Sequence, residues 1–280
     1  MKTFLDEILA DVRTELDTTK AKRPQAEIRR MISDAPAVRL LPAALSEKFC
    51  LIAEIKERSP SVGPMRPENV SDATAAYEHS PIVAAISVLT NQMHFGMSIE
   101  RMGSIRKLGS KPVLRKDFII EEYQVREARA FGADAVLLMA NVLDPARLTG
   151  FYDLARELGM EALFEVHTEQ EIFALPRDAR VVGINSRKFK AKSGFVGKEG
   201  ASETDFSLDY SAFELAGKLP AGTLRVAESG LSPKLATEVS EHFNAALVGT
   251  SLLRDARGLR ACLEEFEDTI NALPGDKPVW

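Results

Sequence analysis

The sequence predicts a parallel α/β barrel of eight strand–helix repeats, and two patterns carry that prediction. Short apolar runs alternate with amphipathic segments, which is typical of a parallel sheet covered by helices. Polar side chains stand at the carboxyl ends of most of these runs, and in a closed barrel those ends converge on one face. We therefore expect a single (β/α)8 barrel domain over residues 1–280, with an N-terminal helical extension over residues 1–46 packed on the barrel.

The N-terminal extension is expected to be helical because its apolar residues recur at helical spacing: Phe4, Ile8, Leu9, Val12 and Leu16. Pro24 ends this helix, since proline breaks a helix interior. A second helical piece near residues 26–32 then leads to the first strand.

Apolar runs predict eight strands, at residues 51–56, 83–89, 112–118, 135–139, 162–166, 181–185, 224–228 and 245–249. Amphipathic segments predict the helices that follow them, at residues 70–79, 99–108, 121–131, 145–158, 169–175, 210–219, 233–242 and 259–270. The main alternative is a doubly wound open sheet. It is disfavoured because no predicted strand is followed by a G-x-G-x-x-G turn.

The end of the first strand is the most informative stretch. Glu54 and Lys56 are two residues apart, so their side chains point to the same face of the strand. Burying both charges is costly unless they pair or serve a ligand. Pro60 then turns the chain into a loop directly beyond them. This arrangement indicates an active site at the mouth of a barrel, and a purely structural ion pair is the alternative.

Composition and charge exclude several classes of protein. The chain has 36 basic and 41 acidic residues, a net charge of −5 and no basic tract, so no nucleic-acid partner is expected. Two cysteines without zinc-site spacing indicate a reducing, cytoplasmic location. Acidic residues follow Met1 where a signal peptide needs an apolar core, and no run is long enough to cross a membrane. The four histidines are scattered singly, and none is expected to bind metal.

Glycine and hydroxyl residues after the seventh and eighth strands predict a phosphate site. Ser229 and Gly230 close the seventh strand, and Gly249 and Thr250 close the eighth. Loops at these positions form the usual phosphate site of barrel enzymes. Ser59, just past the first strand, adds a further hydroxyl.

Seven motifs in a fixed order extend this pattern: IAEIKERSPS at 52–61, ISVLT at 86–90, PVLRKDF at 112–118, FEVH at 164–167, GINSR at 183–187, AESG at 227–230 and VGTS at 248–251. With them the sequence resembles the indole-3-glycerol phosphate synthases over almost its whole length. The resemblance implies a phosphorylated small-molecule substrate, 1-(2-carboxyphenylamino)-1-deoxyribulose 5-phosphate. The substrate closes to indole-3-glycerol phosphate with loss of carbon dioxide and water, a step of tryptophan biosynthesis that needs no cofactor.

The resemblance also implies roles for individual residues. Lys116 is expected to be the general acid that protonates the substrate carbonyl, and Glu165 its acid/base partner for the dehydration. Lys56 is either a second acid or a charge stabiliser. The residues expected to orient the lysines and substrate hydroxyls are Glu54, Asn185 and Glu228. Those expected to hold the phosphate are Ser59, Ser229, Gly230, Gly249 and Thr250, and those at the anthranilate end are Phe118 and Arg187.

The chain departs from the family pattern in two places. After the second strand the family has Phe-x-Gly-Ser, whereas this chain has Gly96 and Met97 between Phe95 and Ser98. Residues 188–205 form a longer segment than the family norm, rich in Lys, Gly, Ser and Glu. We expect this segment to be a mobile, solvated loop beside the pocket, with a lid over the substrate or a contact with a partner as the alternatives.

Two other functions are weighed against synthesis. Phosphoribosylanthranilate isomerase, another phosphosugar barrel enzyme, needs a cysteine at the end of the first strand, but Cys50 lies at its beginning. A non-catalytic binding homologue would be expected to lack the acid/base set, but Lys56, Lys116 and Glu165 are all present. Synthesis of indole-3-glycerol phosphate is therefore the favoured function.

Overall fold

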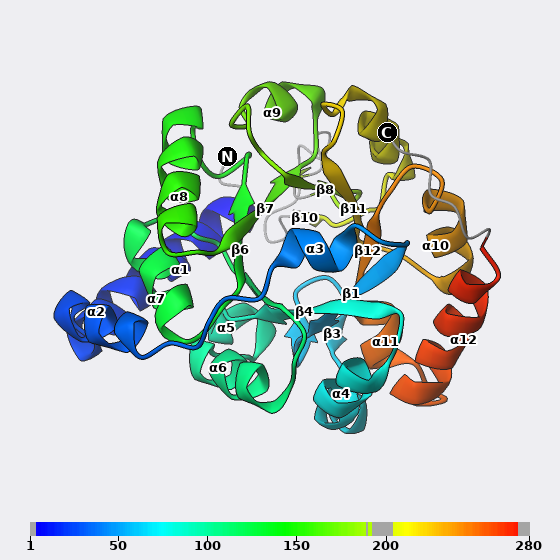
Figure 1. Ribbon diagram of the computed structural model, residues 1–280, viewed down its shortest axis with the longest axis horizontal. Helices are drawn as coiled ribbons and strands as arrows, with labels where there is room; N and C mark the ends of the chain where they lie inside the picture. Colours follow the sequence, from blue (N-terminus) through cyan, green and yellow to red (C-terminus); the bar gives the residue numbers. More distant parts are fainter. Residues whose placement is uncertain (1–3, 189, 192–203, 274–280) are drawn as a thin grey trace, which may run out of the picture.

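The computed structural model describes residues 4–188, 190–191 and 204–273. Within these ranges eight parallel strands close into a barrel in the order β1-β12-β11-β8-β7-β6-β5-β4, ringed by helices (Figure 1). The strands are β1 (Cys50–Ile55), β4 (Val83–Leu89), β5 (Val113–Lys116), β6 (Ala135–Met139), β7 (Glu161–Val166), β8 (Val181–Asn185), β11 (Leu224–Glu228) and β12 (Ala245–Val248). The predicted (β/α)8 barrel is confirmed.

The helices that follow the strands lie close to their predicted positions: α4 (Pro67–His79), α6 (Ile99–Leu108), α7 (Glu122–Ala130), α8 (Pro145–Glu157), α9 (Glu169–Phe173), η1 (Tyr210–Lys218), α10 (Pro233–Val239) and α12 (Leu259–Asn271). The helix predicted at residues 210–219 is present, and it is a 3₁₀ helix. Residues three apart are aligned in this tighter helix, which brings the rings of Tyr210 and Phe213 to 6.0 Å. Phe213 then packs edge-on against Phe243.

Several short elements were not predicted. They are the helices α3 (Leu41–Leu45), α5 (Gln92–Phe95) and α11 (Thr250–Arg254), the ribbon of β2 (Arg58–Ser59) with β3 (Gly63–Pro64), and the ribbon of β9 (Lys190–Ala191) with β10 (Thr204–Asp205). All are too short to show a helical or strand periodicity in the sequence. Among the described helices, none combines the length and hydrophobicity that a bilayer crossing requires.

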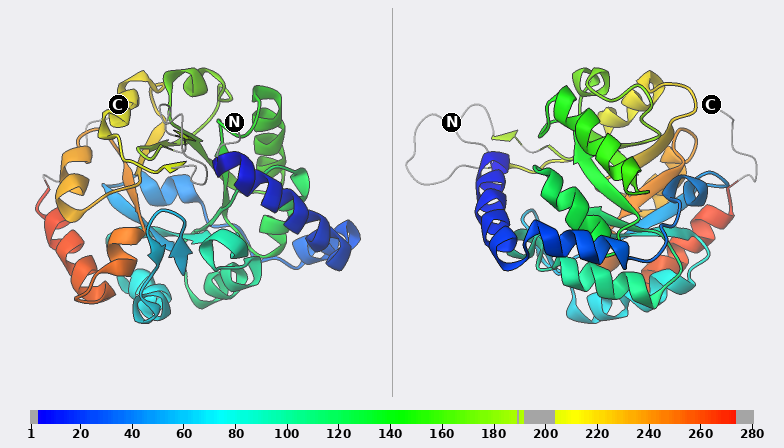
Figure 2. Two further views of the ribbon diagram at one scale, coloured as in Figure 1. Left: turned by 180° about the vertical axis from the view of Figure 1, so that it is seen from behind. Right: turned by 60° about the vertical axis from the view of Figure 1, so that its left-hand side comes forward.

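The N-terminal extension contains α1 (Phe4–Lys22) and α2 (Gln25–Ser33), separated at Pro24 as predicted. α1, dark blue in Figure 2, lies beside the barrel. It buries Ile8, Val12 and Leu16 in the same apolar cluster as the barrel's inward-facing residues. Arg23 at its end forms an ion pair with Glu127 of α7 at 2.9 Å. The assignment of all 280 residues to one barrel domain stays a prediction, because the described ranges do not cover the whole chain.

Strand parity decides which side chains enter the barrel. Along β1, Leu51, Ala53 and Ile55 belong to the apolar layer between strands and helices, whereas Ile52 belongs to the inner cluster. Glu54 shares the parity of Ile52 and so points into the barrel. Hydrophobic residues fill most of the interior, so polar groups gather at the carboxyl ends of the strands.

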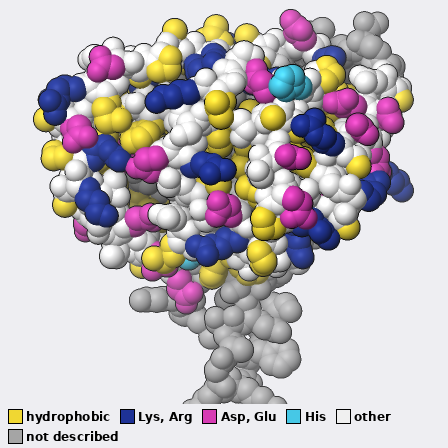
Figure 3. All heavy atoms as spheres, turned by 90° about the horizontal axis from the view of Figure 1, so that it is seen from below, with side chains coloured by type: hydrophobic (Ala, Val, Ile, Leu, Met, Phe, Trp, Pro, Cys, Tyr) yellow, Lys and Arg dark blue, Asp and Glu magenta, His cyan; other side chains and the backbone are white. Residues whose placement is uncertain are grey.

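The surface carries both signs of charge. On the face shown in Figure 3, Lys and Arg side chains are interspersed with Asp and Glu. The expected absence of a nucleic-acid partner rests on net charge and stays a prediction.

A buried ion pair braces the amino end of the barrel, opposite the predicted site. Asp134, with no solvent-accessible surface, accepts hydrogen bonds from Arg106 Nε at 2.7 Å and from its guanidinium Nη2 at 3.0 Å. The same carboxylate accepts the backbone N–H groups of Arg39 and Val113, each at 2.8 Å. It therefore joins the segment after α2, helix α6 and strand β5.

We expect Asp134→Ala to lower the free energy of unfolding by about 3–5 kcal/mol, because it leaves the buried guanidinium of Arg106 without its partner. Urea unfolding followed by circular dichroism measures this change. Asp153→Ala, at an exposed position of α8, is the control and should stay within about 0.5 kcal/mol of the parent. A loss at Asp134 as small as that of the control would contradict the bracing role.

Candidate active site

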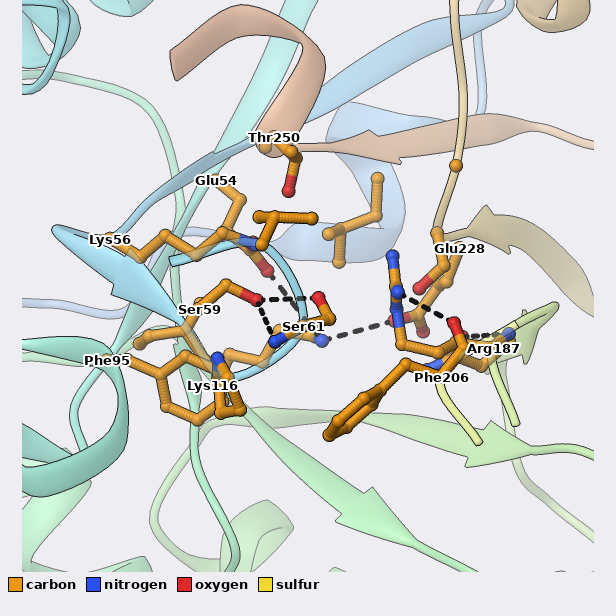
Figure 4. Close-up of a pocket in the computed structure, with 18 of the residues that line it drawn as sticks. Glu54, Lys56, Ser59, Ser61, Phe95, Lys116, Arg187, Phe206, Glu228 and Thr250 are labelled. Carbon is orange, nitrogen blue, oxygen red and sulfur yellow. Dashed lines mark hydrogen bonds and ion pairs between the residues drawn. The ribbon is translucent and has the colours of Figure 1, made fainter. Parts of the chain in front are cut away.

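A cavity of about 550 Å³ opens at the carboxyl ends of the barrel strands. Every residue that the sequence predicts as catalytic or substrate-binding lies in its lining: Glu54, Lys56, Ser59, Lys116, Phe118, Glu165, Asn185, Arg187, Glu228, Ser229, Gly230, Gly249 and Thr250. The structure therefore brings residues from distant parts of the chain to one cavity. Figure 4 shows labelled side chains of this set around the cavity.

Lys116 stands at the end of β5 among three buried carboxylates. Its ammonium nitrogen lies 3.5 Å from Glu228 Oε2, 3.7 Å from Glu54 Oε2 and 3.8 Å from Glu165 Oε2. These carboxyl groups come from β11, β1 and β7, so the lysine lies between side chains of three separate strands. The Lys116 side chain is only 15% exposed, so water solvates its ammonium group little and the carboxyl groups stabilise its charge instead.

Glu54 also forms a short ion pair with Lys56. Lys56 Nζ donates a hydrogen bond of 2.5 Å to Glu54 Oε1, and both side chains are buried. Because the two oxygens of Glu54 face different lysines, this carboxylate fixes the distance between the two cations. The alternative of a purely structural ion pair does not account for the position of Glu54 and Lys56 in the pocket wall.

Burial and neighbouring charge set the protonation states of the site. Burial alone would lower the pKa of Lys116, but Glu228, Glu54 and Glu165 outweigh it and raise that pKa, so Lys116 stays protonated. Burial, together with the nearby Glu165 carboxylate, raises the pKa of Glu228 to about 8. Burial would also raise the pKa of Glu165, but Lys116 and His167 lower it to about 2. Near neutral pH the two carboxyl groups of Glu165 and Glu228 therefore hold one proton between them, and it is on Glu228.

This proton leaves the pocket cationic. Its charged side chains are the cations Lys56, Lys116 and Arg187 and the acidic residues Glu54, Asp117, Glu165 and Glu228. Asp117 is paired at 3.0 Å with Arg115, which lies outside the lining. With Glu228 neutral and Asp117 balanced by Arg115, three cations face two ionised carboxylates, which leaves one net positive charge. A cavity of this charge suits an anionic ligand.

Two glycines make room for the carboxylates. A Cβ atom on Gly183, in the middle of β8, would lie 1.9 Å from Glu228 Oε1. A Cβ on Gly249 would lie 2.5 Å from Glu54 Oε1. Sequence reasoning assigned Gly249 to phosphate binding and gave Gly183 no role, although a glycine inside an apolar strand signals a close approach.

The loop after β11 has an unusual backbone. Ser229 has φ of 73° and is the one non-glycine residue with positive φ in the described part of the chain, and Gly230 follows with φ of 69°. The Tyr210 hydroxyl donates to Gly230 O at 3.0 Å, and the Ser186 hydroxyl donates to Ser229 O at 3.1 Å. Strained backbone of this kind is held only where its surroundings fix it, and it clusters at ligand sites.

Ser59 lies across the cavity, in the loop after β1. Its hydroxyl is within 2.9 Å of the Ser61 hydroxyl, and both residues line the pocket. Together with Thr250 at the start of α11, these hydroxyls line the same cavity as the glycine loops (Figure 4).

Aromatic rings and Arg187 also line the pocket. Phe95 and Phe118 lie nearly parallel, with ring centroids 6.4 Å apart. Arg187 donates from its guanidinium to Phe206 O at 3.1 Å, and its backbone N–H donates to Asn185 Oδ1 at 2.9 Å. The lining therefore offers apolar rings to a flat ligand group and a cation to a negative charge.

Sequence reasoning missed the part of α1 that covers the pocket. Phe4 and Ile8 line the cavity, and the Phe4 ring packs edge-on against Phe206 at 5.1 Å. The helical spacing of Phe4 and Ile8 was visible in the sequence, but spacing alone does not show what an apolar face covers. Sequence reasoning also gave no role to His167, whose Nε2 atom lies 3.3 Å from Glu165 Oε1 behind the cavity lining. The spacing of two residues between Glu165 and His167 was visible in the sequence.

The two departures from the family pattern have different outcomes. Gly96 ends α5 with φ of 83°, and the Ser98 hydroxyl caps α6 by accepting the Arg101 N–H. Met97 is buried in the core, so Phe95 is the residue of this group that reaches the pocket. The predicted mobility of residues 188–205 falls mainly on residue 189 and residues 192–203, which lie outside the described residues.

Comparison with known proteins gives a consistent result. A family model described as indole-3-glycerol phosphate synthase matches residues 5–265. A relative of that name from Kineococcus radiotolerans is 39% identical over 271 residues, covering 92% of this chain and 93% of the relative. A relative from Streptomyces coelicolor, named indole-3-glycerol phosphate synthase 2, is 36% identical over 260 residues, covering 91% of this chain and 95% of the relative.

The chain belongs to the indole-3-glycerol phosphate synthase family. Solved structures support the fold of this synthase family member without bearing on its chemistry. A crystal structure titled 3-hexulose-6-phosphate synthase has a TM-score of 0.55 at 14% identity, covering 79% of this chain and all of that one. Another, titled "Native KDPGal structure", has a TM-score of 0.53 at 16% identity, covering 80% and 95%.

The raised pKa of Glu228 predicts that the folding stability of this family member falls as pH rises. Glu228 keeps its proton in the folded protein up to about pH 8, whereas the unfolded chain loses it near the ordinary value of about 4.3. The favourable contribution is therefore complete at low pH and is lost as pH rises through that window. Glu228→Gln does not titrate, so its Tm should gain on the parent's as pH rises from about 4 to about 8.

Thermal unfolding at several pH values measures this gain. Glu264→Gln, which alters an exposed carboxylate of α12, is the matched control and should show no such trend. A Tm difference between Glu228→Gln and the parent that does not change with pH would contradict a raised pKa at Glu228.

Proposed function

We propose that the protein catalyses the synthesis of indole-3-glycerol phosphate from 1-(2-carboxyphenylamino)-1-deoxyribulose 5-phosphate, as a carboxy-lyase of the carbon–carbon class. One observation carries the proposal beyond family membership: the protonated Lys116 stands among Glu54, Glu165 and Glu228 in a cationic pocket. That pocket contains a proton donor, an ionised base and room for a substrate with two anionic groups and a flat ring.

The proposed chemistry begins with proton donation. Lys116 gives its proton to the substrate carbonyl oxygen as the aromatic carbon attacks the carbonyl carbon, forming the carbon–carbon bond. The carboxylate on that aromatic carbon then leaves as carbon dioxide, and its bonding electrons restore the ring. In the dehydration, the hydroxyl leaves as water after protonation by Lys56 or Lys116. Ionised Glu165 removes a proton from the adjacent CH2 group, and the electrons of that C–H bond form the carbon–carbon double bond of the indole.

Lys116 and Lys56 have different environments for these steps. Lys116 faces three carboxylates, which favour its charged form, so it begins the reaction protonated. Lys56 forms an ion pair with Glu54, within the part of the chain that the structure describes. In the proposal Lys116 is the first acid, and Lys56 is the second acid or stabilises the developing charge.

Substrate orientation follows from the two ends of the pocket. The phosphate would lie against Ser59, Ser229, Gly230, Gly249 and Thr250, where bare backbone and hydroxyl groups are available. The anthranilate ring would lie against Phe118, with Arg187 near its carboxylate. Asn185, which hydrogen-bonds to Glu165, would keep that base in place.

The isomerase alternative lacks the cysteine that it needs at the end of the first strand. Cys50, at the start of β1, contacts Asn244 O, at the opposite end of the barrel from the pocket. The non-catalytic alternative does not account for the cluster around Lys116. Burying three carboxylates and a lysine together is costly, and a binding module gains nothing from a proton donor.

Replacing Lys116 by methionine tests this function, because methionine keeps much of the volume but has no proton to donate. We expect kcat to fall about 10²–10⁴-fold while the fold is retained. Turnover is measured as indole-3-glycerol phosphate formed from the carboxyphenylamino substrate, by fluorescence of the indole product.

Lys107→Met, at an exposed position of α6, is the control and should keep parental turnover. A parent protein that forms no indole-3-glycerol phosphate would overturn the proposed function. A Lys116→Met variant within a few-fold of the parent would remove Lys116 from the role of acid.

A further inference from the structure

His167 lies directly after β7, two residues beyond Glu165, and stands between two carboxylates. Its Nε2 atom is 3.3 Å from Glu165 Oε1, and its Nδ1 atom is 3.3 Å from Glu171 Oε2. Glu171 belongs to α9, the short helix that follows β7. The imidazole thus joins the pocket carboxylate to a helix outside the pocket.

The position of the ring is fixed on both sides. The His167 backbone N–H donates to Glu171 Oε2 at 2.7 Å. The Glu171 backbone N–H donates to the Thr168 hydroxyl at 3.3 Å. The His167 side chain is 14% exposed and does not line the cavity. It therefore contacts Glu165 from behind, leaving the other oxygen of Glu165 to face Lys116.

The charges around this pair come from several elements. Glu165 is faced by Lys116 from β5, by Glu228 from β11 and by the amide of Asn185 from β8, with Glu54 of β1 on the far side of Lys116. On η1, which packs against α9, Lys218 pairs with the neighbouring Glu169 at 3.3 Å. His167 therefore supplies the positive charge closest to Glu165 on the side away from Lys116.

Glu165 and Glu228 share one proton near neutral pH. The proposed reaction requires this proton on Glu228, so that Glu165 stays ionised and can act as the base. Lys116 lies at similar distances from both carboxylates, 3.8 Å and 3.5 Å, so it does not by itself decide between them. His167 faces Glu165 alone of the two. A second cation beside Glu165 favours the ionised form of that carboxylate and sends the proton to Glu228.

We propose that His167 is a positioning residue for the synthase reaction, its imidazolium bridging Glu165 and Glu171 so that Glu165 is held ionised and oriented toward Lys116. The importance of that base for catalysis rests on the proposed function, whereas the charged bridge itself does not. Burial would lower the pKa of His167, but Glu165 and Glu171 raise it to about 10. The bridge thus stays charged across the pH range in which an ordinary histidine is neutral.

The charge on His167 is tested first, without reference to activity. In protein labelled with ¹⁵N-histidine, one of the four histidines should give imidazolium signals from both ring nitrogens at about pH 8. That signal should be missing in His167→Gln. In Glu165→Gln and in Glu171→Gln it should change to the neutral form at lower pH than in the parent. A neutral His167 at about pH 8 in the parent would overturn the proposal.

The consequence for the base is tested by the pH dependence of kcat/KM. In His167→Gln the acid limb should move up by about 1–3 pH units, because Glu165 loses one of its two cations. kcat should fall more than KM rises. Glu171→Gln should move the limb in the same direction by less, which provides the test if the glutamine at position 167 impairs folding.

His79→Gln is the matched control, since His79 is exposed on α4 and bonds to the Ala75 carbonyl. Its profile should match the parent's. Profiles of the His167 and Glu171 variants that also match the parent's would overturn the positioning role. Failure of the parent to form indole-3-glycerol phosphate would refute the proposed function instead, and the ¹⁵N signals would still report on the bridge.

Discussion

The pocket depends on the charge balance around Lys116, where one ammonium faces three buried carboxylates from three strands. Three ionised carboxylates at this spacing would repel one another strongly, so one of them must be neutral or paired. The structure uses both solutions. Glu54 is paired with Lys56, while Glu228 keeps its proton.

The barrel makes this arrangement possible because it fixes strand ends without help from the ligand. Parallel strands bring Glu54, Lys116, Glu165 and Glu228 to one face, and Gly183 and Gly249 leave the space that two of the carboxylates occupy. Bracing at Asp134 stabilises the opposite end of the same barrel. The buried ion pair of Asp134 and the charged groups of the pocket thus lie at opposite ends of the barrel.

Much of this was predictable from local patterns. The spacing of Glu54 and Lys56 placed both on one face, and the eight apolar runs predicted the barrel, because strand parity and burial act over a few residues. The covering of the pocket by Phe4 and Ile8 was not predictable, since it depends on where α1 packs. Nor was the bridge of His167 to Glu171, or the order in which the carboxylates titrate. Both depend on distances between strands, which the sequence does not contain.

The proton on Glu228 is observed most directly by carboxyl ¹³C signals of ¹³C-glutamate-labelled protein, followed from about pH 4 to about pH 10 in the parent and in Glu228→Gln. The charge balance predicts one glutamate that titrates at about pH 8 in the parent and is absent from the variant. If every glutamate of the parent is already ionised by about pH 6, Lys116 faces three charged carboxylates and the proposed division of the proton between Glu165 and Glu228 is wrong.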